Sequence, residues 1–312
     1  MSRGAWLISR LLQMVPTFLL IGLAVFVLAR MLPGNAVMAM LGERGSDEAV
    51  ARLTASLGLD KSIFAQLVAF LEGVVSGRLG DSLAFRIPVT RLIADRLPVT
   101  MMLTGLAVIF ALSTSVPLAF VAALNANRWP DLLIRGVFQV GLSSPIFYVG
   151  LVMLTVFAAW LRIFPVGGYG DTLGEHIYHL FLPAMALGLS FAAIVMRNLR
   201  ASILGVINAE YVDFARAKGL RSRVILVRHV MRNALIATVT LVGLEIGSLL
   251  GGAVITETVF AVPGVGRLMV DSIFARDYPV FQALTLTLAV FVSLAFLVTD
   301  IVQMWLDPRV GR

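Results

Sequence analysis

Cysteine is absent from the 312-residue chain, and lysine occurs only at Lys61 and Lys218. Without cysteine there are no disulfides, no thiolate chemistry and no cysteine metal sites. A P-loop needs a lysine between glycine and serine or threonine, but the residues before the two lysines are Asp60 and Ala217. The chain therefore cannot bind a nucleotide through this motif, and energy for any transport must come from a gradient or from a partner protein.

Charge is also scarce. Charged residues make up 14% of the chain, hydrophobic residues make up 59%, and the mean hydropathy is +0.93. The apolar residues form long runs, and a helix of about 20 such residues crosses the hydrocarbon core of a bilayer. The sequence therefore predicts an all-α integral membrane protein. The six predicted membrane-spanning helices are 11–28, 101–124, 136–161, 180–196, 234–256 and 280–299.

Basic residues are unevenly distributed between the predicted loops. Eight of them lie in the loop 197–233, whereas the short loops after the third and fifth spans carry only Arg162, Arg267 and Arg276. Cytoplasmic loops of membrane proteins are enriched in lysine and arginine, so both termini and the loop 197–233 are predicted to be cytoplasmic. Topology thus explains the pI near 10.5. The sequence contains no basic soluble domain, so nucleic-acid binding is not predicted.

Three consecutive parts follow from this topology. Residues 1–30 hold the N-terminal segment and the first span, which is too long for a signal peptide and is expected to remain uncleaved. Residues 31–99 form an outer loop whose apolar residues recur at helical spacing, which predicts short amphipathic helices. Residues 100–312 form the transmembrane core, which includes the loop 197–233.

The segment EYVDFARAKGLRSRVILVRHVMRNA, residues 210–234, predicts a short helix over 209–218. Asn208 is the expected N-cap, acidic residues occupy the first turn, and two cations in the last turn suit the negative end of the helix dipole. Gly219 follows at the position where a left-handed C-cap favours glycine. These signals predict a compact helix that projects from the membrane.

The predicted helix also carries an apolar face. Tyr211, Phe214 and Ala215 have the spacing i, i+3, i+4 that places residues on one side of a helix. An apolar face on so short a helix favours docking into a groove of a partner. The alternative is a basic loop that lies on anionic lipid headgroups.

This segment resembles the cytoplasmic loop of permeases of ATP-binding-cassette (ABC) importers. Their E-A-A signature, followed after three residues by glycine, falls on Asp213, Phe214, Ala215 and Gly219, with Asp and Phe in place of Glu and the first Ala. The form ARAKGL followed by RHVMRNA is similar to B-type permeases of dipeptide and oligopeptide importers. The stretches ISRLLQMVPTFLLIGLAVFVLARMLPGN, SSPIFYVGLVML, FPVGGYG, HLFLPAMALGL and ITETVFAVPGVGRLMVDSIFARDYPVFQA extend the resemblance, in order, over nearly the whole chain.

The resemblance implies a type I ABC-importer permease fold in the inner membrane of a bacterium or archaeon. It implies alternating access for di- or oligopeptides, with a second homologous permease, two cytoplasmic ATPases that bind ATP and Mg²⁺, and an extracytoplasmic binding protein as partners. The chain itself would bind no cofactor and catalyse no reaction. The residues that the resemblance assigns to ATPase coupling are Tyr211, Asp213, Phe214, Ala215, Arg216, Lys218 and Gly219.

Two further sets of residues are candidates for function. Glu245 is the only acid deep inside a predicted span, where it either lines a water-filled path or bonds to a neighbouring helix. The segment TETVFAVPGVG is rich in turn residues, and the resemblance implies an outer mouth that meets the binding protein. The candidates for the pathway are Glu245, Gly247 and Ser144. The candidates for the outer mouth are Glu257, Pro263, Gly264 and Gly266.

Other functions have weaker support in the sequence. His176 and His179 form an H-x-x-H pair, but no third ligand of suitable type is evident, so no metal site is predicted. An enzyme is not predicted, because there is no H-E-x-x-H motif and no histidine inside a span to serve as a base. A nickel importer permease, a proton-coupled carrier that uses Glu245, and a membrane scaffold remain as alternatives.

Overall fold

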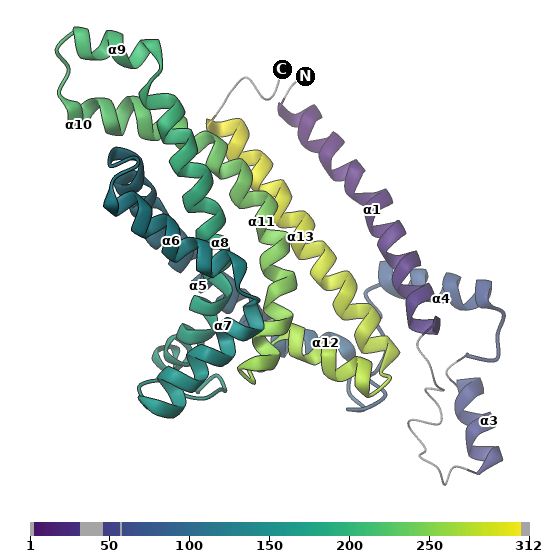
Figure 1. Ribbon diagram of the computed structural model, residues 1–312. Coiled ribbons are helices and arrows are strands. Elements are labelled where there is room, and N and C mark those ends of the chain that lie inside the picture. Colours follow the sequence, from purple (N-terminus) through teal and green to yellow (C-terminus); the bar gives the residue numbers. More distant parts are fainter. Residues whose placement is uncertain (1–2, 32–45, 57, 307–312) are drawn as a thin grey trace. The chain divides into compact units, whose positions relative to one another are not determined.

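The computed structural model describes residues 3–31, 46–56 and 58–306 (Figure 1). Within these ranges the chain is helical, and the only β-structure is an isolated bridge between Asp81 and Pro88. The helices are α1 (Arg3–Met31), α3 (Asp47–Ser56), α4 (Ile63–Val75), α5 (Val89–Leu124), α6 (Trp129–Ser143), α7 (Ile146–Met153), the π-helix η1 (Leu154–Trp160), α8 (Leu173–Ile207), α9 (Glu210–Ala217), α10 (Ser222–Val224), the π-helix η2 (Ile225–Met231), α11 (Arg232–Val259), α12 (Val265–Phe274) and α13 (Tyr278–Leu306).

Five helices are long and apolar enough to cross a membrane, and a sixth crossing is possible if one bent pair of helices counts as a single span. The five are α1, α5, α8, α11 and α13, which contain the predicted spans 11–28, 101–124, 180–196, 234–256 and 280–299. The predicted span 136–161 is not one helix. It is divided between α6 and the α7–η1 pair, which meet at an angle of 106°.

The bend in this third span occurs at Ser144 and Pro145. Both residues have extended backbone, with ψ of 132° at Ser144 and 139° at Pro145. Proline disfavours helical backbone at the residue before it and cannot donate its own backbone hydrogen bond. The helix therefore stops at Ser143 and a new one begins at Ile146.

The described chain forms two compact units, and each has its own core. The first unit contains residues 101–262 and the described residues 294–306. Its central element is α8, which packs against α6, α7 and α11 and buries 14 of its residues. Small residues permit this close packing. At Gly188, an added Cβ would lie 2.7 Å from the carbonyl oxygen of Ala107 on α5.

The second unit contains residues 263–293 and the described residues up to 100. It combines the first span and the predicted outer loop with α12 and the start of α13, so the compact units do not follow the order of the chain. Within the described part of residues 31–99, the chain forms the short helices α3 and α4. The core of this unit joins the start of α5 to α12 and α13 through Val89, Leu92, Ile93, Val265, Leu268, Val280, Ala283 and Leu284.

Candidate functional site

The predicted cytoplasmic helix is present as α9, Glu210–Ala217. The N-cap prediction was wrong by one residue. Ala209 is the N-cap, with extended backbone (φ −80°, ψ 142°) and no side-chain cap bond. Asn208 instead ends α8, and its side-chain amide donates a 3.0 Å hydrogen bond to the carbonyl of Leu204. The helix therefore begins without a capping side chain, although Glu210 and Asp213 lie in its first turn.

The C-terminal end of α9 is specified more strongly. Gly219 has φ +74°, the left-handed conformation that glycine adopts without a steric cost. Its N–H bonds to the carbonyl of Arg216 at 2.9 Å, and the N–H of Leu220 bonds to the carbonyl of Ala215 at 3.3 Å. This pair of hydrogen bonds is the Schellman motif. It satisfies carbonyls of the last turn and confirms the predicted glycine C-cap.

α9 has one buried face and one exposed face. Val212 is fully buried and Ala215 is 6% exposed, whereas Tyr211 is 42% and Phe214 is 68% exposed. The inner face packs against η2, which returns the chain toward α11 (Figure 1). The prediction that Ala215 shares a face with Phe214 was therefore wrong, because Ala215 lies on the inner face together with Val212.

The outer face of α9 combines an aromatic pair with cations. The Tyr211 hydroxyl accepts a 3.0 Å hydrogen bond from the side-chain amide of Asn233, which fixes the ring. Arg216 and Asp213 form an exposed ion pair of 2.9 Å, and such a pair contributes about 0–1 kcal/mol to stability. Phe214 remains as a large apolar side chain that neither unit of the described chain covers.

The pathway candidates occupy separate helices. Glu245 lies on α11 and is partly exposed, and in the described part of the chain it forms no hydrogen bond or ion pair. Gly247, two residues further along α11, is also partly exposed. Ser144 sits at the bend after α6, where its hydroxyl donates a 2.8 Å bond to the carbonyl of Val140. Gly243 packs directly on Thr299 of α13, whereas Gly251 faces open space.

The outer candidates are held in place by their surroundings. The Glu257 side chain is fully buried near the end of α11. Its side chain is therefore not offered to a docking protein in this conformation. Gly264 and Gly266 are also buried, and Pro263 is partly exposed. Arg96 donates to the carbonyl of Pro263 at 3.3 Å.

This anchoring continues into α12. The hydroxyl of Thr100 accepts a 2.8 Å bond from the N–H of Val265, the first residue of the helix. α5 therefore fixes both the turn and the start of α12. The predicted turn is thus hydrogen-bonded to α5. Ala261 is exposed within it, and Phe274 is 84% exposed on α12.

The two histidines of the H-x-x-H pair are used in packing. Nδ1 of His176 lies 2.8 Å from the carbonyl of Tyr169, and Nδ1 of His179 lies 2.8 Å from the carbonyl of Gly167. Because a carbonyl only accepts hydrogen bonds, each Nδ1 carries the proton. The His176 ring also stacks on Tyr169 with centroids 3.8 Å apart. These contacts attach the loop 167–169 to the first turns of α8.

The structure also contains a buried ion pair that was not predicted from the sequence. Asp131 of α6 is fully buried and accepts bonds from Nε and Nη2 of Arg200 on α8, at 2.7 and 2.6 Å. A third bond comes from the N–H of Asn127 at 2.8 Å. The pair joins α6 to the end of α8 that leads into α9. No sequence motif signals it, because the partners are 69 residues apart.

Comparisons with known proteins agree with this architecture. Residues 115–312 match the family model of the binding-protein-dependent transport system inner membrane component, and residues 4–104 match the model of its N-terminal part. The dipeptide transport system permease protein DppB of Escherichia coli K12 is 36% identical, with 98% of each chain covered. The glutathione transport system permease protein GsiC of the same strain is 35% identical, also with 98% of each chain covered.

A solved structure shares the fold. A chain in the crystal structure of an amino acid ABC transporter with histidines superposes with a TM-score of 0.50 at 18% identity, over 66% of this chain and 94% of that one. Family models cover both parts of the sequence, and curated relatives align over nearly its full length. The chain therefore belongs to the family of binding-protein-dependent transport system inner membrane components, as a multi-pass permease of the inner membrane.

Proposed function

We propose that the chain is the permease subunit of an ATP-driven importer of di- or oligopeptides, and that α9 is the helix that docks onto a partner ATPase. In this proposal both termini and α9 are cytoplasmic. Two cytoplasmic ATPases bind ATP and Mg²⁺, a second permease completes the pathway, and an outer binding protein delivers the peptide. The relatives named for dipeptide and glutathione transport support a peptide substrate.

The exposed aromatic face of α9 carries the proposal. Phe214 is 68% exposed on a helix of only eight residues whose opposite face is buried. A short helix with an apolar outer face fits a groove in a partner protein. α8 ends at Ile207 and α11 begins at Arg232, so α9 lies between two membrane-spanning helices in the chain. A movement of α9 would be passed to both of them.

The size of the effect follows from the exposed area. Full burial of a phenylalanine side chain contributes about 1.5–3 kcal/mol. Phe214 has about two thirds of its surface left to bury, so its removal would cost about 1–2 kcal/mol of docking free energy. We therefore expect Phe214→Ala to weaken ATPase association by roughly 5- to 30-fold. Tyr211→Ala should act in the same direction but less strongly, because the ring is less exposed.

The test uses the complete complex in proteoliposomes, with its binding protein and both ATPases. We expect Phe214→Ala to lower substrate-stimulated ATP hydrolysis and peptide uptake together. Val227→Ala is the matched control, because Val227 is an exposed apolar residue on η2 in the same loop but outside α9. Normal coupling and assembly in Phe214→Ala/Tyr211→Ala would remove α9 from the mechanism.

Substrate class and energy source need separate measurements. Uptake of labelled dipeptide and of labelled nickel by the same proteoliposomes distinguishes a peptide importer from a metal importer. Transport by the purified chain alone, driven by a pH gradient, would contradict ATP coupling. In that case Glu245→Gln should abolish the gradient-driven flux, since Glu245 is the acid in the middle of α11.

A further inference from the structure

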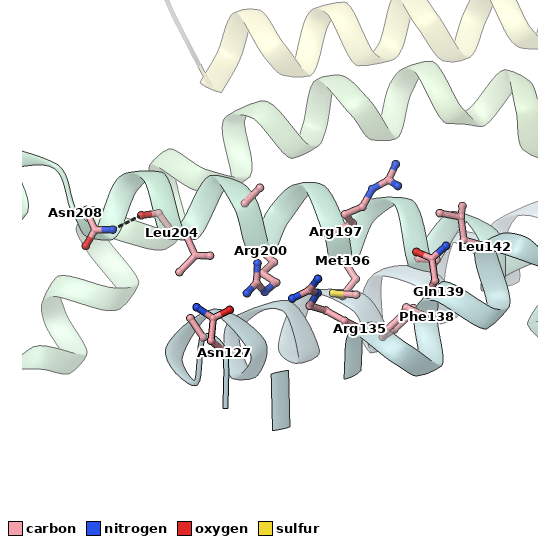
Figure 2. Close-up of a pocket in the computed structure, with 13 residues that line it drawn as sticks. Asn127, Arg135, Phe138, Gln139, Leu142, Met196, Arg197, Arg200, Leu204 and Asn208 are labelled. Carbon is pink, nitrogen blue, oxygen red and sulfur yellow. Dashed lines mark hydrogen bonds between the residues drawn. The ribbon is translucent and has the colours of Figure 1, made fainter. Parts of the chain in front are cut away.

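A cavity of about 540 Å³ lies between α6 and α8, in the first unit. Figure 2 shows Arg135 of α6 and Arg200 of α8 with their side chains in the space between the two helices. Arg197, one turn before Arg200, also belongs to its wall. The remaining wall is mixed. Its apolar members are Phe138, Leu142, Met196 and Leu204, and its amides are Asn127, Gln139 and Asn208.

The charges of this cavity do not balance. Asp131 is the one carboxylate that contacts its arginines, and it is bound to Arg200 and to a backbone N–H. Within the residues that the structure describes, the exposed Arg135 and Arg197 form no ion pair, although the charge of Arg135 still acts on Asp131 one turn before it. The wall therefore carries more positive than negative charge. Arg135 and Arg200 lie in the space between the two helices, whereas the Arg197 side chain extends away from them (Figure 2). A cavity of this kind favours an anion, and guanidinium groups bind phosphate oxygens in a bidentate manner.

The position of the arginines along the helices matches the depth of lipid headgroups. Arg200 is seven residues before the end of α8, and Arg135 is six residues after the start of α6. At 1.5 Å per residue both lie about 10 Å from the helix ends. Arg197 is the first charged residue after the apolar run 180–196. The arginines therefore lie where the apolar part of α8 ends and the polar boundary of the bilayer begins.

The outer surface of α6 beside the cavity suits acyl chains. On the membrane side of Arg135, Val137 is 59% exposed and Val140 is 68% exposed. Trp129 is 75% exposed at the start of the same helix, and tryptophan is enriched at membrane boundaries. An anion site and an adjacent apolar helix surface are together what a phospholipid requires. A soluble anion would use only the first of them.

We propose that the cavity between α6 and α8 binds the headgroup of an acidic phospholipid, with Arg135 facing it, Arg200 oriented by Asp131 and Arg197 as a further cation at its rim. The inference rests on the cytoplasmic placement of α9 in the proposed function, because it assigns the site to the cytoplasmic leaflet. The bound lipid would join α6 to the last turns of α8, next to α9. It would stabilise the end of the bundle on which the ATPases are proposed to act.

The test measures thermal stability of the purified complex in a neutral detergent with added phosphatidylglycerol. Each basic residue near an anionic membrane surface contributes about 1 kcal/mol, or roughly a fivefold change in affinity. We expect phosphatidylglycerol to raise the midpoint of unfolding, with an apparent affinity about 5-fold weaker in Arg135→Gln and about 30-fold weaker in Arg135→Gln/Arg197→Gln. Arg135→Lys/Arg197→Lys keeps the charge and should retain most of the shift.

The control is Arg223→Gln/Arg228→Gln, which removes two exposed arginines from the same predicted cytoplasmic segment but outside the cavity. It should retain the full lipid effect. An equal shift in Arg135→Gln/Arg197→Gln and the wild type would overturn the proposal, as would an equal shift from phosphatidylcholine. A shift of the same size from glycerol phosphate would show a site for soluble anions instead of lipid. Loss of the second permease from the purified Arg135→Gln/Arg197→Gln complex would assign the arginines to a subunit interface.

Discussion

Removal of the Asp131 carboxylate should be among the most destabilising single changes in the first unit. Asp131 is fully buried and accepts three hydrogen bonds, two from Arg200 and one from the N–H of Asn127. Deletion of one partner of a buried ion pair costs about 3–5 kcal/mol, because the other charge is left without compensation. Arg200 is 16% exposed, so it can regain some water. We therefore expect the lower value, about 3 kcal/mol, for Asp131→Ala.

The measurement is thermal unfolding of the complex by intrinsic fluorescence. For chains of this size, 1 kcal/mol corresponds to about 2 °C, so the midpoint should fall by about 6 °C. Glu48→Ala is the matched control, because it breaks an ion pair of 2.8 Å whose partners are both about four-fifths exposed. It should leave the midpoint unchanged.

A double-mutant cycle separates the pair from its surroundings. If the two groups interact as the geometry indicates, Asp131→Ala/Arg200→Ala should be less destabilised than the sum of the two single variants by at least 1 kcal/mol, roughly. Strict additivity would show that the two side chains do not stabilise each other. An Asp131→Ala midpoint equal to that of Glu48→Ala would refute the reasoning from burial.

Three further changes test the packing and the caps. Gly188→Ala places a Cβ 2.7 Å from a backbone carbonyl of α5 and should lower the free energy of unfolding by about 1–3 kcal/mol. The control is Gly205→Ala, in open space on the same helix. It should be neutral or stabilise by up to about 1 kcal/mol. Asp277→Ala removes the buried acceptor of the Ser82 hydroxyl and should speed limited proteolysis of the loop 81–88, whereas unchanged cleavage would contradict this anchoring role. Gly219→Ala puts a side chain at φ +74° and should cost about 1 kcal/mol of helix stability, seen as weaker substrate-stimulated ATP hydrolysis without loss of assembly.

The sequence predicts the membrane-spanning helices because hydrophobic runs report burial in lipid directly. The same signal could not locate the bend of the third span. Proline alone does not mark such a bend, since Pro16 and Pro183 lie inside the continuous helices α1 and α8, whereas Pro145 begins a new helix. In a membrane, neighbouring helices and local adjustments can satisfy the carbonyl that a proline leaves free. Whether the helix bends at a given proline therefore depends on packing that a single sequence does not contain.

The two ends of α9 also show which features follow from nearby residues and which depend on other helices. Gly219 was predictable because a left-handed C-cap depends on one residue and its own backbone. The N-cap was misplaced because Asn208 instead ends the preceding helix, where its side chain bonds back to Leu204. The inner face of α9 was not predicted, because the burial of Val212 depends on η2, which follows later in the chain. The sequence therefore predicted the cap that depends on the local backbone, but it did not predict the contacts of α9 with other helices.

The proposed coupling also depends on residues outside α9, because α8 connects α9 to the rest of the first unit. It is one continuous helix that buries 14 of its residues against its neighbours and ends three residues before α9 begins. A packed interior has few voids and transmits strain, so α8 should move as a rigid body when α9 is displaced. Asp131 and Arg200 join its last turns to α6, whose far end is the bend at Ser144. A force applied to α9 would therefore reach this bend through a buried ion pair. Asp131→Ala should weaken the coupling of substrate binding to ATP hydrolysis more than loss of the exposed Asp213–Arg216 pair of α9 would.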